Sequence, residues 1–295
     1  MHGTPKAFIA LRTLLRSLGQ VVLQPNAVTG ACMFAAWLAC DRRLAFAALL
    51  GAVTANIGAA GAGLDAHDSR IGLHGFNGAL ASLLAFTFIP TNITATAIAI
   101  LASTGPVCLL GPWTRWLRSH GLCAYSSPCL IATWIWLPAV NTVTPVAPNS
   151  TAHAFTLTNA TSVVLAGLAQ TGFASGALSG LFVLAGIAAA SRRAACWALA
   201  GAAIASGSQL LLDAGATSFS LSLSGFNGAL AALALAECGV IATLGGIALS
   251  VALQQLAGHY GLPALSAPFV VAAWVVQLVN RRLRAATVGL SSSPP

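Results

Sequence analysis

Charged side chains are scarce in this chain. Only 13 lysines and arginines and 5 aspartates and glutamates occur among 295 residues, so 6% of the residues are charged, whereas a soluble domain carries about 25%. Such a chain cannot cover its surface with polar groups, and this excludes a soluble globular protein. Together with 57% apolar residues, the scarcity of charge predicts an integral, multi-pass protein of the inner or plasma membrane, with the lipid bilayer as its surroundings.

The sequence also lacks the residue sets of most enzymes and metal sites. Its 7 cysteines mostly lie inside apolar segments without metal-ligand spacing, as small packing residues do. No Gly-x-Ser-Gly setting and no His–Glu cluster occurs. We therefore expect no enzyme and no cofactor or metal. Arg12 and Arg16 interrupt the N-terminal apolar stretch and no small-x-small site follows, so no cleaved signal peptide is predicted.

The excess of positive charge, formally +8, does not indicate nucleic acid as a partner. The cations cluster at the ends of apolar runs, where they act as topology and headgroup anchors. Arginine pairs begin at Arg42 and at Arg192, in corresponding places. The arginines within residues 281–284 predict a cytoplasmic C-terminus.

The chain contains an internal repeat. The word Gly-Phe-Asn-Gly-Ala-Leu occupies residues 75–80 and again residues 225–230, an offset of 150, which also relates Gln20 to Gln170. Ser126 and Ser266, each two residues before a proline, are offset by 140, so about ten residues are missing from the second half. In an apolar chain, two homologous halves indicate a channel or transporter with its pathway between them.

Apolar runs of helical length fill both halves, each near or somewhat under the roughly 20 residues that cross a bilayer. Alanine and glycine dominate them, as expected where helices pack closely within a membrane. They span residues 27–40, 44–62, 77–90, 92–111, 128–142, 178–190, 194–212, 227–236, 238–256 and 263–280.

The first segment of each half predicts a helix that does not cross the membrane. Residues 7–22 are amphipathic and stop before Pro25, so they form either an interfacial helix or a re-entrant helix that ends inside the protein. The equivalent segment, 155–172, is uncharged up to Gln170 and favours the re-entrant helix. Helix ends inside a membrane protein leave unpaired carbonyls, which are tolerated where they line a wet cavity and favour a permeant rich in N–H donors.

The doubled word, the segment from Gln20 to Gln24 before a turn, and the Leu-Pro-Ala-Leu-Ser-Ala-Pro-Phe stretch at 262–269 together resemble the urea transporter family over nearly the whole chain. The resemblance implies an all-α fold of two inverted halves, residues 1–148 and 149–295, each with five transmembrane helices and one re-entrant helix. It also implies a homotrimer with one pore per protomer and passive, channel-like permeation of urea.

The resemblance assigns twelve residues to the pore. Gln20 and Gln170 would stand at the ends of the re-entrant helices, and phenylalanine and leucine four apart would form the apolar faces of a flat slot. Serine stands at the narrow middle, where the family usually has threonine. In pairs across the halves the residues are Gln20 and Gln170, Phe76 and Phe226, Leu80 and Leu230, Ser126 and Ser266, Val21 and Thr171, and Leu23 and Phe173.

Alternatives remain for several polar residues. Asn77 and Asn227 are more typical of residues that staple a broken helix than of a permeant contact. Glu237 and Asp213 are the acids most suited to membrane depth, and if one titrates, the protein would be a proton-coupled carrier or channel for a small amide or ammonia. An ammonium channel would use paired histidines, but His74 is matched by a serine.

Overall fold

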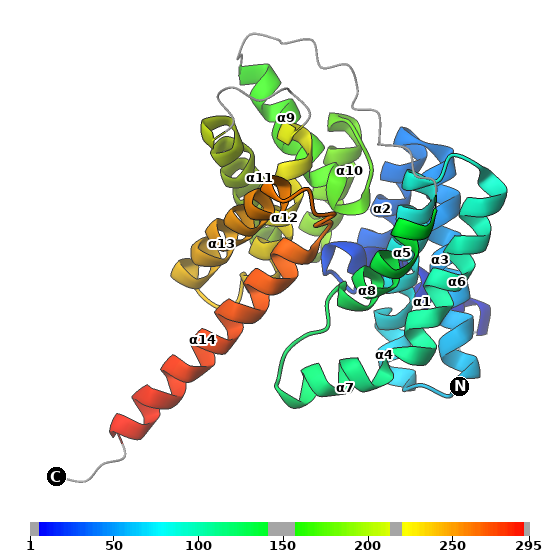
Figure 1. Ribbon diagram of the computed structural model, residues 1–295, viewed down its shortest axis with the longest axis horizontal. Helices are drawn as coiled ribbons and strands as arrows, with labels where there is room; N and C mark the ends of the chain where they lie inside the picture. Colours follow the sequence, from blue (N-terminus) through cyan, green and yellow to red (C-terminus); the bar gives the residue numbers. More distant parts are fainter. Residues whose placement is uncertain (1–5, 141–156, 213–219, 292–295) are drawn as a thin grey trace.

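The computed structural model describes residues 6–140, 157–212 and 220–291, and within these ranges all regular structure is helical. The two halves repeat one order of elements and lie side by side, with α14 projecting away from the other helices (Figure 1). The first half contains α1 (Lys6–Gly19), η1 (Gln20–Val22), α2 (Ala27–Cys40), α3 (Arg42–Gly61), α4 (Ala66–Arg70), α5 (Leu73–Phe88), α6 (Asn92–Leu109), α7 (Gly111–Ser119), α8 (Ser127–Trp136) and η2 (Leu137–Ala139). The second half contains α9 (Leu157–Ala169), η3 (Gln170–Gly172), α10 (Ala177–Ala190), α11 (Arg192–Leu212), α12 (Ser220–Leu235), α13 (Val240–His259) and α14 (Ala267–Ser291).

Several helices have the length and composition of membrane spans. Among the described residues, α3, α6 and α13 qualify individually, and two bent pairs add up to two more candidate spans. The sequence predicts ten spans. Part of the difference arises because α5, α8 and α12 are apolar but short. The sixteen residues of α5 rise only about 24 Å, less than a hydrocarbon core of about 30 Å, and α8 is shorter still. Large apolar side chains remain exposed on the outside, such as Ile93 and Ile241, as in a protein that faces lipid.

The first helix of each half bends sharply into the next. The α1–η1 segment meets α2 at 72°, and the α9–η3 segment meets α10 at 69°, across breaks of at most four residues. Pro25 lies within the first break, and Asn26 starts α2 by accepting a hydrogen bond from Val28 N at 2.8 Å. The exposed first turns of α1 lead to a buried end at Ser17, Leu18 and Gly19. Solvent exposure therefore falls along α1, as expected of a helix that runs from the surface into the interior.

The missing residues of the second half correspond to α7. In the first half α6 ends at Leu109, and a separate nine-residue helix, α7, follows from Gly111. In the second half α13 continues without a break to His259, and the turn after it matches the turn after α7. The insertion therefore adds an amphipathic helix to one half only.

Glycines set the distance between the helices of each half. A Cβ on Gly78 of α5 would lie 2.3 Å from Gly51 O on α3, and a Cβ on Gly228 of α12 would lie 2.6 Å from Gly201 O on α11. Only glycine permits this approach, which is the small-residue packing expected of membrane helices. The second glycine of the repeated word is thus explained in both copies by packing.

The arginine pairs bond within the protein rather than serving only as surface anchors. Arg43 donates to Phe86 O at 2.9 Å and to Ile89 O at 2.6 Å, and Arg193 donates to Ala236 O at 2.9 Å. In both halves the second arginine of the pair therefore satisfies carbonyls at or just after the end of the helix that carries the repeated word.

Contacts between the halves are reciprocal. Thr29 Oγ1 on α2 donates to Gly186 O on α10 at 2.7 Å, and Ser179 Oγ on α10 donates to Ala36 O on α2 at 3.0 Å. Residues 29 and 179, and residues 36 and 186, are repeat partners at the offset of 150. Reciprocal contacts between equivalent residues are the pattern of a local two-fold relation.

A second reciprocal pair joins the C-terminal parts of the halves. Trp134 Nε1 donates to Pro263 O at 2.9 Å, and Trp274 Nε1 donates to Cys123 O at 2.7 Å. These partners are related by the offset of 140. Both indoles tie one half to the segment that precedes the constriction serine of the other, so they hold the halves in register.

Candidate functional site

One narrow cavity collects residues that lie up to about 250 positions apart in the sequence. Eleven of the twelve residues assigned to the pore line it, together with Phe269, which the sequence analysis does not assign. Its volume is about 20 Å³, roughly what one or two water molecules need. The lining residues are Val21, Leu23, Phe76, Leu80, Ser126, Gln170, Thr171, Phe173, Phe226, Leu230, Ser266 and Phe269.

The repeated word supplies two walls of the cavity. Phe76 and Leu80 lie four residues apart on α5, and Phe226 and Leu230 hold the same positions on α12. Side chains four apart share one face of a helix. All four are buried, with at most 9% of their surface exposed. The walls are therefore aromatic and aliphatic, held on helices rather than on loops.

Two hydroxyl groups meet across the cavity. Ser126 Oγ and Ser266 Oγ are 2.8 Å apart and share a hydrogen bond, although the residues come from different halves. Each serine immediately precedes a helix, α8 or α14, and so stands at the junction of a loop and a helix. This bond joins the two halves directly across the passage.

Asn77 holds the loop that carries the first serine. Its Nδ2 donates to Tyr125 O at 3.2 Å, and its Oδ1 accepts from Cys129 N at 3.1 Å. The amide thus bridges the residue before Ser126 and the first turn of α8. Asn77 lines no part of the cavity, so the expected stapling role agrees with its contacts.

Asn227 makes the same bridge in the second half. Its Nδ2 donates to Leu265 O at 3.0 Å, and its Oδ1 accepts from Phe269 N at 3.3 Å. Its Nδ2 also donates to Gln254 Oε1. The asparagine of each repeated word therefore positions the serine of its own half.

Backbone strain gathers around the cavity. The described non-glycine residues with left-handed φ are Leu23 (59°), Tyr125 (48°), Phe173 (61°) and Leu265 (49°), which form two repeat pairs. Leu23 and Phe173 line the cavity, while Tyr125 and Leu265 precede the serines. Such conformations cost about 1–3 kcal/mol each and occur where the surrounding structure enforces them, often at functional sites.

The two short helices end at the cavity, but their glutamines differ. Gln170 lines the cavity, and its buried Oε1 has no hydrogen-bond partner among the described residues. Gln20 does not line it, because its Nε2 is directed to Ile71 O at 3.4 Å. Gln20 thus lies outside the lining of this cavity, and its role in the pore stays a prediction.

Phe269 is the lining residue that sequence reasoning missed. It lies three residues after Ser266, within one helical turn, and is 2% exposed. Its repeat partner is Cys129, which is buried but does not line the cavity. Because the repeat identifies residues in matching pairs, it does not point to a lining residue whose partner lies outside the cavity. Its position one turn after the serine was the available signal.

Ionisable groups lie away from the cavity wall. Glu237 follows the end of α12 at Leu235, with its side chain 84% exposed and its carboxylate 3.5 Å from Arg193. Asp213 lies outside the described residues.

The polar cluster near α4 and α7 is a surface feature. Arg118 and Asp68 form a 2.7 Å ion pair, which raises the pKa of Arg118. Asp65 starts α4, and hydrogen bonds from His67 N and Asp68 N lower the pKa of its carboxyl. None of these groups lines the cavity, so its described wall is neutral.

A family model described as urea transporter matches residues 11–281, nearly the whole chain. The chain belongs to the urea transporter family. Transport of urea across a membrane is the activity that this membership supports, and the family is one of transporters rather than enzymes. A search of curated proteins finds no match.

For a urea transporter, the cavity has a consistent chemistry. Its walls combine flat apolar faces with oxygen atoms from Ser126, Ser266 and Gln170. Urea is a planar molecule with N–H donors at its edges, and these oxygens can accept hydrogen bonds from such donors. A charged solute would lose its hydration without an opposite charge to replace it.

Proposed function

We propose that this member of the family is a passive, channel-like pathway for urea, and that urea crosses through the cavity between the halves. The observation that carries the proposal is the hydrogen bond between Ser126 and Ser266 at the centre of a slot with apolar faces and no ionisable wall residue. The pair acts as a selectivity filter, because it is where the permeant must exchange hydrogen bonds with the protein.

The serines must separate for urea to pass. A cavity of about 20 Å³ has room for one or two water molecules and not for urea. As the hydroxyls part, each accepts or donates one hydrogen bond to urea in place of their mutual bond. Because a neutral hydrogen bond contributes about 1 kcal/mol net, the exchange is nearly balanced, which suits downhill flux without an energy source.

The phenylalanine and leucine pairs select for flatness. Phe76 and Leu80 face the passage from α5, while Phe226 and Leu230 face it from α12. A planar solute can pass between these walls with its N–H edges toward the oxygens. A hydrated cation cannot, since the apolar faces offer no replacement for its water shell.

The proposed architecture has two inverted halves, residues 1–148 and 149–295, each with five spanning helices and one re-entrant helix. The reciprocal contacts of Thr29 with Gly186 and of Ser179 with Ala36 support a two-fold relation. An odd number of spans in each half makes that axis lie in the membrane plane, so the halves face opposite sides. We further propose a homotrimer with one pore per protomer in the inner or plasma membrane.

Flux into proteoliposomes tests the transport class. We expect urea uptake that is weakly saturating or non-saturating, stops at the external concentration and does not respond to a pH gradient. Accumulation above the external level under a pH gradient would overturn the proposal in favour of a proton-coupled carrier. Parallel measurements with acetamide, formamide, methylurea and ammonia define the permeant range, and liposomes with a Ser126→Val, Ser266→Val protein serve as the blocked control.

A further inference from the structure

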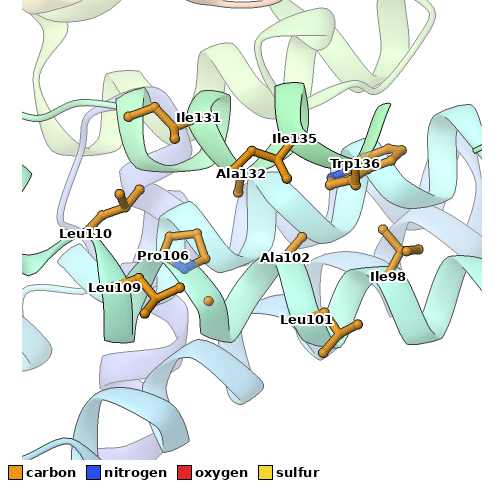
Figure 2. Close-up of a pocket in the computed structure, with 11 residues that line it drawn as sticks. Ile98, Leu101, Ala102, Pro106, Leu109, Leu110, Ile131, Ala132, Ile135 and Trp136 are labelled. Carbon is orange, nitrogen blue, oxygen red and sulfur yellow. The ribbon is translucent and has the colours of Figure 1, made fainter. Parts of the chain in front are cut away.

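A second, larger cavity opens on the outside of the first half, away from the urea pathway. It is a groove of about 240 Å³ between α6 and α8. One wall comes from the face of α6 that runs from Ile98 to Leu109, and the other from α8, with Ile135 and Trp136 (Figure 2). Apart from the indole nitrogen of Trp136, the lining side chains are hydrocarbon. The groove is therefore suited to an apolar occupant.

The insertion of α7 accompanies this groove. After Leu109 the chain leaves the line of α6 and starts the separate helix α7, whereas α13 in the second half continues straight. Gly105 lines the groove, and a Cβ added there would meet no atom within 4 Å. The groove therefore has free space beside Gly105 that a larger side chain could enter.

The groove has the length of one leaflet. Eleven residues separate Ile98 from Leu109, which is about 16 Å along a helix. One leaflet is half of a hydrocarbon core of about 30 Å, so its thickness is nearly equal to the length of the groove. The groove begins near the middle of α6 and ends where α6 adjoins α7.

A cation stands at the α7 end of the groove. The guanidinium of Arg115 lies over the start of α7, with Nη1 3.3 Å from the position of a Cβ on Gly111, next to the lining residue Leu110. Arg118 on the same helix is paired with Asp68. Arg115 is exposed and makes no ion pair or hydrogen bond among the described residues.

The rest of α7 has the character of an interfacial helix. Trp113 and Trp116 stack with ring centroids 5.3 Å apart. Tryptophans and arginines on a short amphipathic helix are typical of the headgroup level of a membrane. The apolar groove therefore ends where a lipid phosphate would lie.

We propose that the groove between α6 and α8 binds one membrane glycerophospholipid, with an acyl chain along Ile98 to Leu109 and the phosphate at Arg115. The apolar walls recognise the chain, the leaflet length fits it, and the free guanidinium favours an anionic headgroup. The site is separate from the urea pathway, and the proposal does not depend on the mechanism of transport.

Native mass spectrometry of the full chain, purified from mixed phosphatidylglycerol and phosphatidylcholine nanodiscs, tests the acyl-chain site. Gly105→Leu places a side chain in the groove at a position where a Cβ meets no atom within 4 Å, and it should lose the retained lipid. Gly245→Leu is the matched control, because Gly245 lies on α13 of the second half and also has open space around its Cβ position. Equal lipid retention by the two variants would overturn the proposal. A change in oligomeric mass with unchanged lipid for Gly105→Leu would also overturn it, in favour of a second copy covering the groove.

The headgroup contact has its own variant. Arg115→Gln should keep the lipid but lower the preference for phosphatidylglycerol over phosphatidylcholine by about fivefold, the factor that one basic residue near a charged membrane surface supplies. Arg192→Gln, an exposed arginine of the second half, should leave the preference unchanged. An unchanged preference in Arg115→Gln would overturn the placement of the phosphate.

Discussion

At the residue scale, four of the six residues of the repeated word have an identifiable structural role. In the first copy Phe76 and Leu80 face the cavity, Asn77 positions the loop of Ser126, and Gly78 lets α5 approach α3. The second copy performs the same tasks with the same geometry. The repeated word is identical in both halves because the cavity lining, the asparagine bridge and the close helix approach all depend on its residues.

Removing a constriction hydroxyl should slow urea. Ser126→Ala or Ser266→Ala removes one hydrogen-bonding group and leaves the other serine without its 2.8 Å partner. We expect a slower flux by about 1–3 kcal/mol in the barrier, the cost of an unmade hydrogen bond in a desolvated site, and a similar effect for both. Stopped-flow urea uptake into proteoliposomes measures it. The double variant should slow flux by less than the sum, because the two hydroxyls interact.

Serine-to-threonine variants provide the matched control, since they keep the hydroxyl. A folded double alanine variant that carries urea at the unchanged rate would show that the pathway lies elsewhere.

Truncating an aromatic wall should loosen selectivity before it stops flux. Phe76→Ala or Phe226→Ala removes one flat face of the slot and leaves the oxygens in place. Acetamide and methylurea should then permeate faster relative to urea. Their flux ratios against urea are the measurement, with the exposed Phe46→Ala as control. Unchanged ratios in both cavity variants would contradict the slot.

At the element scale, the structure depends on close helix pairs. A Cβ on Gly78 would lie 2.3 Å from Gly51 O, and one on Gly228 would lie 2.5 Å from the Ala205 side chain. Both distances are shorter than the contacts that Cβ atoms make in proteins, so even an alanine at either position would force the two helices to shift. The short helices α5 and α12 are held by this packing more than by their own length.

Alanine at these glycines should destabilise the folded protein. We expect Gly78→Ala and Gly228→Ala each to cost about 1–3 kcal/mol, as overpacking of a dense interior does. Thermal unfolding of the detergent-purified protein measures the loss. Gly105→Ala and Gly245→Ala, with open space at their Cβ positions, should show no loss, since alanine favours a helix over glycine. Equal stability of all four variants would contradict the packing.

At the scale of the whole molecule, the halves meet through reciprocal bonds and through the hydrogen bond between Ser126 and Ser266. Arg42 and Arg192 begin equivalent helices, α3 and α11. If the halves are inverted, single cysteines at these positions should be labelled from opposite sides of the membrane by an impermeant reagent. Labelling from the same side would contradict inversion.

Urea flux should be insensitive to pH between about 5 and 8. Histidine is the side chain whose ordinary pKa falls in this interval, and no histidine, carboxylate or amine lines the described cavity. The lowered pKa of Asp65 keeps that carboxylate ionised throughout the interval, so its cap on α4 persists. A steep change in flux near pH 6 would contradict the neutral pathway, and His74→Gln would then test the histidine that lies two residues before Phe76 in the sequence.

The sequence by itself determined the class of protein, the helices and most of the cavity lining. Charge scarcity and apolar runs are local properties, so they identified an all-helical membrane protein directly. Repetition added long-range information, because residues such as Ser126 and Ser266 had to occupy equivalent environments. Eleven lining residues were accessible from that equivalence together with the family resemblance.

Only the tertiary structure decided where the two halves differ. Gln20 bonds Ile71 while Gln170 faces the cavity, Phe269 lines it where Cys129 does not, and a separate helix α7 follows α6 in the first half. A repeat pattern predicts what is equal in both halves and is silent about such differences. They depend on packing between elements distant in sequence, and the hydrogen bond that brings Ser126 to Ser266 forms only when both halves are folded against each other.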